Sequence, residues 1–351
     1  MRKGGRAVKA AAVLVIVAGA AVLGYLAYSV PVADRAPHPF NQDRNAVWLE
    51  HRWLEKAQPV PAMESLLSTL AARGVQYVYP HLIPFDREGR LPPHSREQMR
   101  EFRDTARRVA PQMRVLPWIG GLRVGHKRMR PGTIDLADLA QRQRMVAECR
   151  GLIDEGFDGV HLNIEPIDDG NLDILALLQA LRTAIGPDKI LSVSAIRPAP
   201  WSLPATRNFL WTADYYRRLA SAVDQIVIMV YDTGLPTAAL YQRYVAYAAR
   251  FMTATLGEGT HARVLLGLPT YDETGIMHRA GVETLENALL GVVSGLRGKG
   301  EGGTFEGVAL YAEWTTEDDE WSAYEDIWRG RAAAAGTAAS GDGTGRLQVA
   351  R

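Results

Sequence analysis

Eight short apolar runs with the composition of β-strands recur along this sequence, and segments with the spacing of helices separate them. The runs are AVWLEHRW (from residue 46), VQYVYPHL (75), MRVLPWIGG (113), FDGVHLNIE (157), ILSVSAIRP (190), DQIVIMVYD (224), RVLLGLP (263) and FEGVALYAEW (305). Between them, apolar residues recur at spacings of three and four, as in Leu175, Leu178, Leu181 and Ile185, which gives a helix one apolar face. An antiparallel sandwich would have hairpin turns in place of these helices. We therefore predict a single-domain α/β fold, a closed (β/α)8 TIM barrel, from residue 41 to residue 329.

Residues 1–30 have the features of a membrane segment that precedes this domain. Four basic residues, Arg2, Lys3, Arg6 and Lys9, come before an uncharged stretch at 10–30 that is about as long as a bilayer-spanning helix. Because the basic end stays in the cytoplasm, we expect the rest of the chain outside the cytoplasmic membrane. The segment is interpreted either as a signal anchor of a single-pass membrane protein or as a signal peptide. Cleavage after a small-x-small site at Ala27 and Ser29 would secrete the protein.

Two further segments fall outside the predicted barrel. Residues 31–40 (PVADRAPHPF) are rich in proline and are predicted to form a linker. Residues 330–351 have few aliphatic or aromatic side chains and are predicted to be a disordered tail.

The composition and net charge of the chain exclude some classes of protein and of ligand. The formal net charge is +1 and 47% of the residues are hydrophobic, which argues against a nucleic-acid-binding polycation and against a disordered acidic chain. Cys149 is the one cysteine, so the chain forms no internal disulfide. The histidines are scattered and no set of carboxylates or cysteines has ligand spacing, so the sequence predicts neither a metal nor a cofactor.

The run DGVHLNIEP (158–166) presents three polar side chains on one face of a strand. With a period of two, Val160, Leu162 and Ile164 share the apolar face, which would pack beneath the helices of a barrel. His161, Asn163 and Glu165 would then point into the barrel, with Glu165 nearest its C-terminal mouth, where barrel enzymes have their active sites. Buried polar groups need partners, so these three predict an organised network. The alternative is an edge strand whose polar face meets water.

These residues resemble the DGxDxDxE signature of the fourth strand in glycoside hydrolase family 18, the chitinases and related endo-N-acetylglucosaminidases. Asp158, Gly159 and Glu165 match it. IVIMVYD is similar to the family's MxYD motif on strand six, VLLGLP to its strand seven, and Trp314 has the position of its strand-eight tryptophan. The resemblance extends over roughly residues 45–328.

The resemblance implies a substrate-assisted reaction, in which the 2-acetamido oxygen of the sugar attacks the anomeric carbon and one carboxyl suffices. Glu165 is then the acid/base, Asn163 orients the acetamido group and Tyr231 donates a hydrogen bond to its carbonyl. Five further candidates for substrate binding complete the expected site: His161, Asp232, Trp314, Met229 and Trp118.

Two positions depart from the family pattern. Asn163 stands where the family has aspartate, and it can bond an acetamido group without carrying charge. An Asn-x-Glu pair is similar to that of glycoside hydrolase family 85, which performs the same reaction. His161 replaces a second aspartate, and a neutral imidazole is expected to bond Asn163 and fix its amide. With neutral neighbours, desolvation should give Glu165 a high pKa.

The predicted partner is a glycan that contains N-acetylhexosamine, of the chitin, peptidoglycan or N-glycan kind. Three alternatives stay open at this stage. The barrel binds carbohydrate without turnover, it is a two-carboxylate glycosidase that pairs Glu165 with Glu50 or Glu313, or it is a structural protein of the cell envelope.

Overall fold

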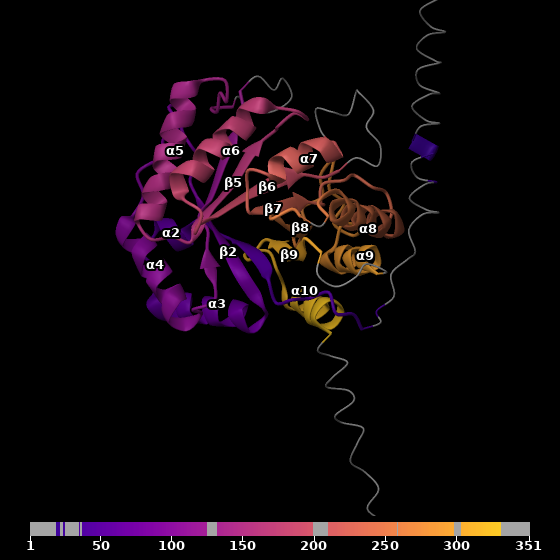
Figure 1. Cartoon of the computed structure of the whole chain (residues 1–351). Coiled ribbons are helices and arrows are strands. Elements are labelled where there is room, and N and C mark those ends of the chain that lie inside the picture. The colour runs from indigo at the N-terminus through magenta and orange to yellow at the C-terminus, as the bar shows by residue number, and fades with distance from the viewer. Residues whose placement is uncertain are drawn as a thin grey trace, which may run out of the picture.

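The computed structural model describes residues 37–124, 132–198, 210–257, 259–297 and 303–330, and the isolated positions 19–21, 24 and 35. Its centre is a closed barrel of parallel strands with helices placed around it (Figure 1). The strands are β1 (Asn45–Leu49), β2 (Val75–Leu82), β3 (Arg114–Val115), β4 (Trp118–Leu122), β5 (Gly159–Glu165), β6 (Ile190–Ile196), β7 (Gln225–Met229), β8 (Arg263–Pro269) and β9 (Phe305–Tyr311). They pair in chain order, and β1 closes the barrel by pairing with both β2 and β9.

The eight predicted strand runs all form barrel strands. β3 and β4 belong to one run, MRVLPWIGG, and both pair with β2. Pro117 lies between them and has no backbone N–H to donate to the ladder, which accounts for the interruption. The barrel therefore has eight strand positions, and the predicted (β/α)8 fold is confirmed.

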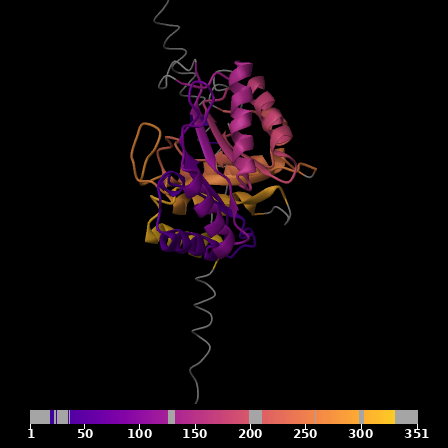
Figure 2. The same ribbon diagram turned by 90° about the vertical axis from the view of Figure 1, so that its left-hand side faces the viewer.

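The helices follow the strands in alternation and cover the barrel. They are α2 (Arg52–Glu55), α3 (Val60–Ala72), α4 (Arg96–Val109), α5 (Leu139–Asp154), α6 (Leu172–Ile185), α7 (Ala213–Ala220), α8 (Ala238–Thr255), α9 (Leu285–Leu296) and α10 (Asp318–Ala323), followed by a π-helix at Tyr324–Arg329. Six begin at a polar residue whose side chain accepts a backbone N–H: Ser95, Asp138, Asn171, Thr212, Thr237 and Thr284. Figure 2 shows α5 and α6 side by side on one flank of the barrel.

The two faces of β5 lie in different environments. Val160, Leu162 and Ile164 belong to the large apolar cluster between strands and helices. A smaller cluster, which includes Trp48 and Tyr79, fills the inside of the barrel. His161 contacts both of those rings. The alternation of β5 was thus predicted correctly, and the edge-strand alternative does not apply because β5 pairs with β4 and β6.

Gly159 begins β5 because a side chain does not fit there. A Cβ at this position would lie 2.0 Å from the carbonyl oxygen of Ile190 on β6. That separation is far below van der Waals contact, so the two strands can pair in this register only with glycine.

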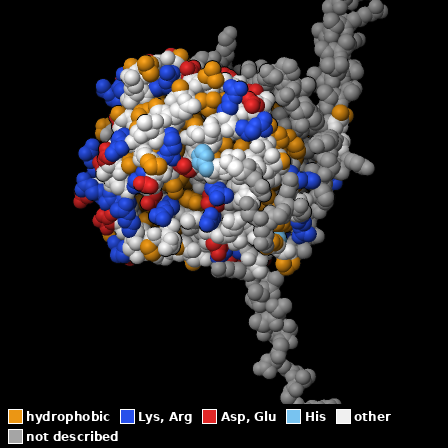
Figure 3. Space-filling model, in the orientation of Figure 1, with side chains coloured by type: hydrophobic (Ala, Val, Ile, Leu, Met, Phe, Trp, Pro, Cys, Tyr) orange, Lys and Arg blue, Asp and Glu red, His pale blue; other side chains and the backbone are white. Residues whose placement is uncertain are grey.

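Among the described residues on the face of Figure 3, Lys and Arg side chains are interspersed with Asp and Glu side chains. No helix within the described residues is both long and apolar enough to cross a bilayer. The predicted membrane segment (1–30) and tail (330–351) lie almost wholly outside the described residues. Of the predicted linker, Arg35 and residues 37–40 are described, and the His38 ring bonds the carbonyl oxygen of Ile327 at 2.7 Å.

Candidate active site

A cavity of about 420 Å³ opens at the C-terminal mouth of the barrel, where the carboxyl ends of β5 to β9 meet. This is the end at which barrel enzymes have their active sites. Its walls come from the ends of these five strands and from the loops that follow them: Asn163, Glu165, Ile196, Arg197, Met229, Tyr231, Asp232, Tyr271, Glu273, Tyr311, Trp314 and Thr315. Six of the eight predicted site residues are in this set.

Glu165 is the last residue of β5; it is half-buried and lines the cavity. Asn163 Nδ2 donates to its Oε2 at 3.4 Å. Burial raises the pKa of Glu165, and the nearby charge of Asp232 acts in the same direction. The hydrogen bond from Asn163 and the charge of Arg197 oppose that shift but do not reverse it. Glu165 therefore holds its proton to higher pH than an ordinary glutamic acid, as a general acid must.

The amide oxygen of Asn163 can accept a further hydrogen bond. Asn163 Oδ1 is buried and has no hydrogen-bond partner among the described residues. A buried acceptor without a partner costs about 1–3 kcal/mol, and an N–H group of a bound molecule would remove that cost. The pair on β5 thus combines an acid with an unfilled acceptor at the same mouth.

Tyr231 follows β7 and is enclosed by other aromatic rings. Its ring stacks on Tyr311 with centroids 5.5 Å apart and meets Tyr271 edge-on at 6.1 Å. Burial raises the pKa of Tyr231 well above its usual value, and the neighbouring Tyr311 and Glu165 add to the rise. Its hydroxyl group accordingly stays protonated and is available as a hydrogen-bond donor.

Asp232, Trp314 and Met229 complete the predicted part of the wall. Asp232 has a left-handed backbone with φ of 55°, and its Oδ1 accepts a hydrogen bond from the Tyr271 hydroxyl at 2.6 Å. The indole of Trp314 is 41% exposed and meets Tyr311 edge-on. An exposed indole beside a cavity offers a flat apolar face to a ligand.

His161 lies beneath the cavity, and its partners differ from the predicted one. Trp48 Nε1 donates to His161 Nε2 at 3.2 Å, so Nε2 is an acceptor and the proton of the neutral ring resides on Nδ1. Nδ1 then donates to Ser192 Oγ at 2.8 Å. Ser194 also bonds Nε2, and the ring stacks on Tyr79 at 4.0 Å. The expected bond to Asn163 is not formed, because these partners use both ring nitrogens.

The polar chain that begins at His161 runs on toward the barrel floor. Ser192 Oγ donates to Gln225 Oε1 at 2.8 Å, and the hydroxyl of Tyr79 donates to the same oxygen at 2.6 Å. Burial lowers the pKa of His161 to about 3, so the ring is neutral. His161 therefore orders the barrel interior and does not touch the cavity.

Trp118 also lies below the level of the cavity. In the β-sheet register it pairs with His161, whereas Asn163 pairs with Gly120 and Glu165 with Leu122. Trp118 is 8% exposed and stacks on His81 with centroids 4.0 Å apart. Trp118 also meets Tyr311 edge-on, so it supports a residue of the cavity wall, but it is not itself among the residues that line the cavity.

The two alternative carboxylates have partners outside the cavity. Glu50 pairs with Arg52 at 3.0 Å. Glu313 accepts from Trp53 Nε1 at 3.3 Å, and burial raises its pKa. Neither residue is among those that line the cavity.

The sequence interpretation did not single out Arg197, Tyr271 and Tyr311. Each stands at or just after the C-terminal end of a predicted strand, and that position was the signal available for them. Arg197 Nη1 donates to the carbonyl oxygen of Tyr231 at 3.1 Å. It thereby connects the ends of β6 and β7.

The fold and the cavity define the class of protein: a (β/α)8 barrel of the glycoside hydrolase type, with an acid, an amide and aromatic rings at its mouth. The chain belongs to a glycosidase family, the glycosyl hydrolases family 18, whose family model matches residues 70–334. The resemblance noted in the sequence is thereby confirmed. Comparison with curated proteins finds none that matches this chain.

Solved structures share the fold. The spore cortex-lytic enzyme SleL of Bacillus cereus has a TM-score of 0.57 at 10% identity, over 83% of this chain and 76% of that one. A chitinase from Rhizomucor miehei has a TM-score of 0.52 at 14% identity, over 81% of this chain and 99% of its own. A chitinase from Chromobacterium violaceum has 0.51 at 15% identity, over 81% and 98%. At such identities the likeness establishes the fold alone.

Proposed function

We propose that this protein is a retaining glycoside hydrolase that cleaves β-linked N-acetylhexosamine glycans by substrate assistance. The observation that carries the proposal is the pair on β5: a carboxyl group with a raised pKa at Glu165, next to an amide at Asn163 whose oxygen has no partner among the described residues. A substrate with a 2-acetamido group supplies both the N–H that this oxygen lacks and the nucleophile that a second carboxylate would otherwise provide.

The reaction has two steps. Glu165 gives its proton to the glycosidic oxygen as the bond to the anomeric carbon breaks, and the acetamido carbonyl oxygen forms a new bond to that carbon. The positive charge spreads over the resulting oxazoline-type ring. The Glu165 carboxylate then takes a proton from water, whose oxygen opens the ring with net retention.

The neighbours of Glu165 hold the acetamido group for this attack. Asn163 Oδ1 accepts its N–H, and the Tyr231 hydroxyl donates to its carbonyl oxygen. Met229 and the exposed indole of Trp314 form walls against which the sugar ring rests. Positioning of the internal nucleophile is worth several kcal/mol, because it replaces an encounter between separate molecules.

We infer that the substrate is a chitin-type or peptidoglycan glycan, the two kinds that the names of the structural neighbours suggest. The test is a screen of the purified protein against labelled N-acetylglucosamine oligomers and peptidoglycan. Glu165→Gln should lower kcat by about 10²- to 10⁴-fold, since it removes the general acid. Inhibition by a sugar thiazoline should accompany turnover, because that compound imitates the acetamido-derived intermediate.

Glu313→Gln is the matched control. Glu313, like Glu165, is a half-buried glutamic acid with a raised pKa just after a barrel strand, but it does not line the cavity. Its replacement should leave turnover intact under substrate assistance. Loss of turnover in Glu313→Gln, without thiazoline inhibition, would support the two-carboxylate alternative. Binding without cleavage in the wild-type protein would identify a carbohydrate-binding barrel.

We also propose that residues 1–30 hold the barrel at the outer side of the cytoplasmic membrane, as a signal anchor or, if cleaved, as an export signal. The support is their basic flank and uncharged length. Cell fractionation with an antibody to the barrel tests this. Full-length protein in the membrane pellet indicates an anchor, a shortened protein in the medium or periplasm indicates a signal peptide, and recovery in the cytoplasm contradicts both.

A further inference from the structure

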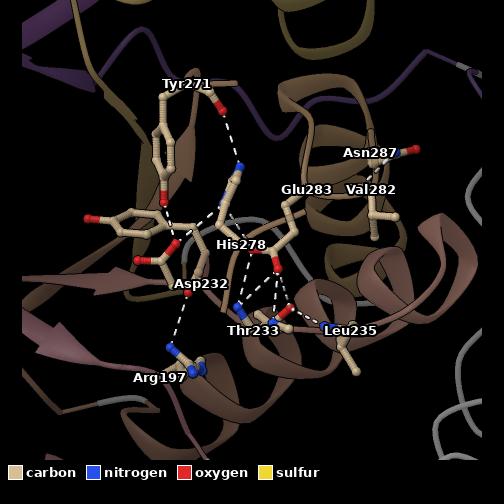
Figure 4. A network of polar contacts seen from close by, with 11 residues as sticks. Arg197, Asp232, Thr233, Leu235, Tyr271, His278, Val282, Glu283 and Asn287 are labelled. Carbon is tan, nitrogen blue, oxygen red and sulfur yellow. Dashed lines mark hydrogen bonds and ion pairs between the residues drawn. The ribbon is translucent and has the colours of Figure 1, made fainter. Parts of the chain in front are cut away.

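Behind Asp232, at the side of the cavity, His278 lies between two carboxyl groups (Figure 4). Asp232 follows β7, His278 is in the loop after β8, and Glu283 comes just before α9. The imidazole is 4% exposed, and its Nδ1 is 3.3 Å from Asp232 Oδ1 and 3.6 Å from Glu283 Oε2.

The contacts of the ring determine where its protons are. His278 Nε2 lies 3.1 Å from the carbonyl oxygen of Tyr271, which only accepts, so Nε2 carries a proton. Nδ1 makes no hydrogen bond to the described residues, but it lies within ion-pair distance of both carboxyl groups. An unprotonated Nδ1 would place a lone pair beside two anions, whereas a proton there attracts both. The geometry thus favours the doubly protonated, positively charged ring.

Glu283 gives a second reason for that charge. Its side chain is fully buried, and its oxygens accept from Thr233 N, Thr233 Oγ1 and Gly234 N. These donors are uncharged. A buried carboxylate without a counter-charge is costly, and the ion pair that reaches Glu283 within the described part of the chain comes from His278.

The same three groups have the composition of a metal site. Several of their lone pairs already accept hydrogen bonds, however: the Tyr271 hydroxyl bonds Asp232 Oδ1, and three donors bond Glu283 Oε1. A proton between the groups needs none of these bonds to be broken, so it is the better occupant.

We propose that His278 is an imidazolium clasp, a positioning residue that holds the Asp232 carboxylate toward the cavity and ties the loop after β8 to the end of β7. The inference rests on the proposed function for its catalytic consequence. Asp232 needs such support because its backbone is in the left-handed region, which aspartate adopts at a cost. Two further bonds fix the same loop: Gly234 N donates to Met277 O at 2.6 Å and Gly275 N to His278 O at 2.9 Å.

Several other titratable or charged groups surround the clasp. Tyr271 lies against the imidazole with ring centroids 4.2 Å apart. Tyr241 on α8 is close enough to interact with both carboxylates, and Arg197 after β6 reaches the same region. Burial raises the pKa of Tyr241 and of Tyr271, so both stay protonated and uncharged, and the charges of this region are those of His278, its two partners and Arg197.

The protonation state can be measured without any assay of activity. In protein labelled with ¹⁵N-histidine, the ring nitrogens of His278 should both show the chemical shift of protonated nitrogen at pH 7. The signal is assigned among the eight histidines by its absence in His278→Gln and by its contact with the Tyr271 ring. A neutral ring, or an unprotonated Nδ1 together with a stoichiometric metal in elemental analysis, would overturn the proposal.

Kinetics test the consequence. His278→Gln should lower kcat by about 10- to 100-fold, with a much smaller change in KM, because a misplaced group costs more in the transition state than in binding. His94→Gln is the matched control, since the His94 ring also bonds a backbone carbonyl oxygen, that of Pro92, but forms no ion pair with a carboxylate of the described residues. Circular dichroism checks that both variants fold. A His278→Gln protein with wild-type kcat would refute the clasp, whereas a failed proposed function would leave the ¹⁵N result standing.

Discussion

Replacement of Asn163 by aspartate tests the electrostatics of the site most directly. Asn163→Asp places a carboxylate where the family motif has one, beside the acid of the proposed reaction. The present contact is a hydrogen bond of 3.4 Å from Nδ2 to Glu165 Oε2. In the variant two carboxyl groups would meet at this distance, and both cannot ionise there without strong repulsion.

The size of the effect follows from that distance. Two unit charges 3.4 Å apart interact by about 5 kcal/mol at an effective dielectric constant of about 20. Since about 1.4 kcal/mol corresponds to one pK unit, the bound is about 3.5 units, and screening by solvent in the open cavity reduces it. We expect the upper apparent pKa of the pair to exceed that of wild-type Glu165 by about one to three units.

The assay is the pH dependence of kcat/KM on a fluorogenic N-acetylglucosamine oligomer. Turnover needs protonated Glu165, so activity falls on the alkaline side as that proton is lost. A higher apparent pKa moves this alkaline limb to higher pH. Asn171→Asp is the control: it adds the same charge at the N-cap of α6, outside the cavity, where aspartate also caps well. An alkaline limb in Asn163→Asp that coincides with that of the wild type would refute the reasoning.

Three further outcomes follow from the same structure. Glu165→Gln should be more stable than the wild type at pH 7 and equally stable near pH 3. The pKa of Glu165 is raised in the folded state, so ionisation above the unfolded-state pKa destabilises the wild-type fold, and glutamine does not ionise. Thermal melting at both pH values tests this, and equal melting temperatures of variant and wild type at pH 7 would contradict it. Trp314→Ala should raise KM about fivefold, equivalent to about 1 kcal/mol of lost stacking, with kcat nearly unchanged, and an unaltered KM would argue against a sugar at this indole. Gly159→Ala should destabilise the fold by about 1–3 kcal/mol in denaturant unfolding because its Cβ would overlap Ile190 O; a wild-type midpoint would contradict the close approach of β5 and β6.

The sequence predicted those features that depend on period and position along a strand. The alternation in β5 correctly assigned three apolar side chains to the outer face and three polar ones to the inside. The same rule brought residues from three strand ends to one mouth, including Glu165, Tyr231 and Trp314. A parallel barrel allows this because all of its strands point the same way, so the C-terminal end of each run is enough to locate it.

Strand period does not predict the register between neighbouring strands or the path of a loop. Trp118 ends a predicted strand, but the pairing of β4 with β5 sets it at the level of His161, one layer below Asn163. His278 comes from a loop whose path no periodicity describes, and its carboxylate partners are 46 and 5 residues away in the chain. Sequence spacing therefore gave no reason to group these three residues.

The exchange of two family aspartates for His161 and Asn163 changes where charge resides in this barrel. His161 is neutral, and the hydrogen bonds that run from it through Ser192 to Gln225 join uncharged groups. Burial contributes most to the raised pKa of Glu165, and the charges that act on it are then those of Asp232, which raises the pKa, and Arg197, which lowers it. Since Asp232 is in turn paired with His278, the protonation of the proposed acid depends on residues at the mouth and not on those beneath it. A substitution at His161 that keeps the interior packed should consequently change the free energy of unfolding and leave the pH dependence of kcat/KM almost unaltered. A substitution at Asp232 should shift that pH dependence.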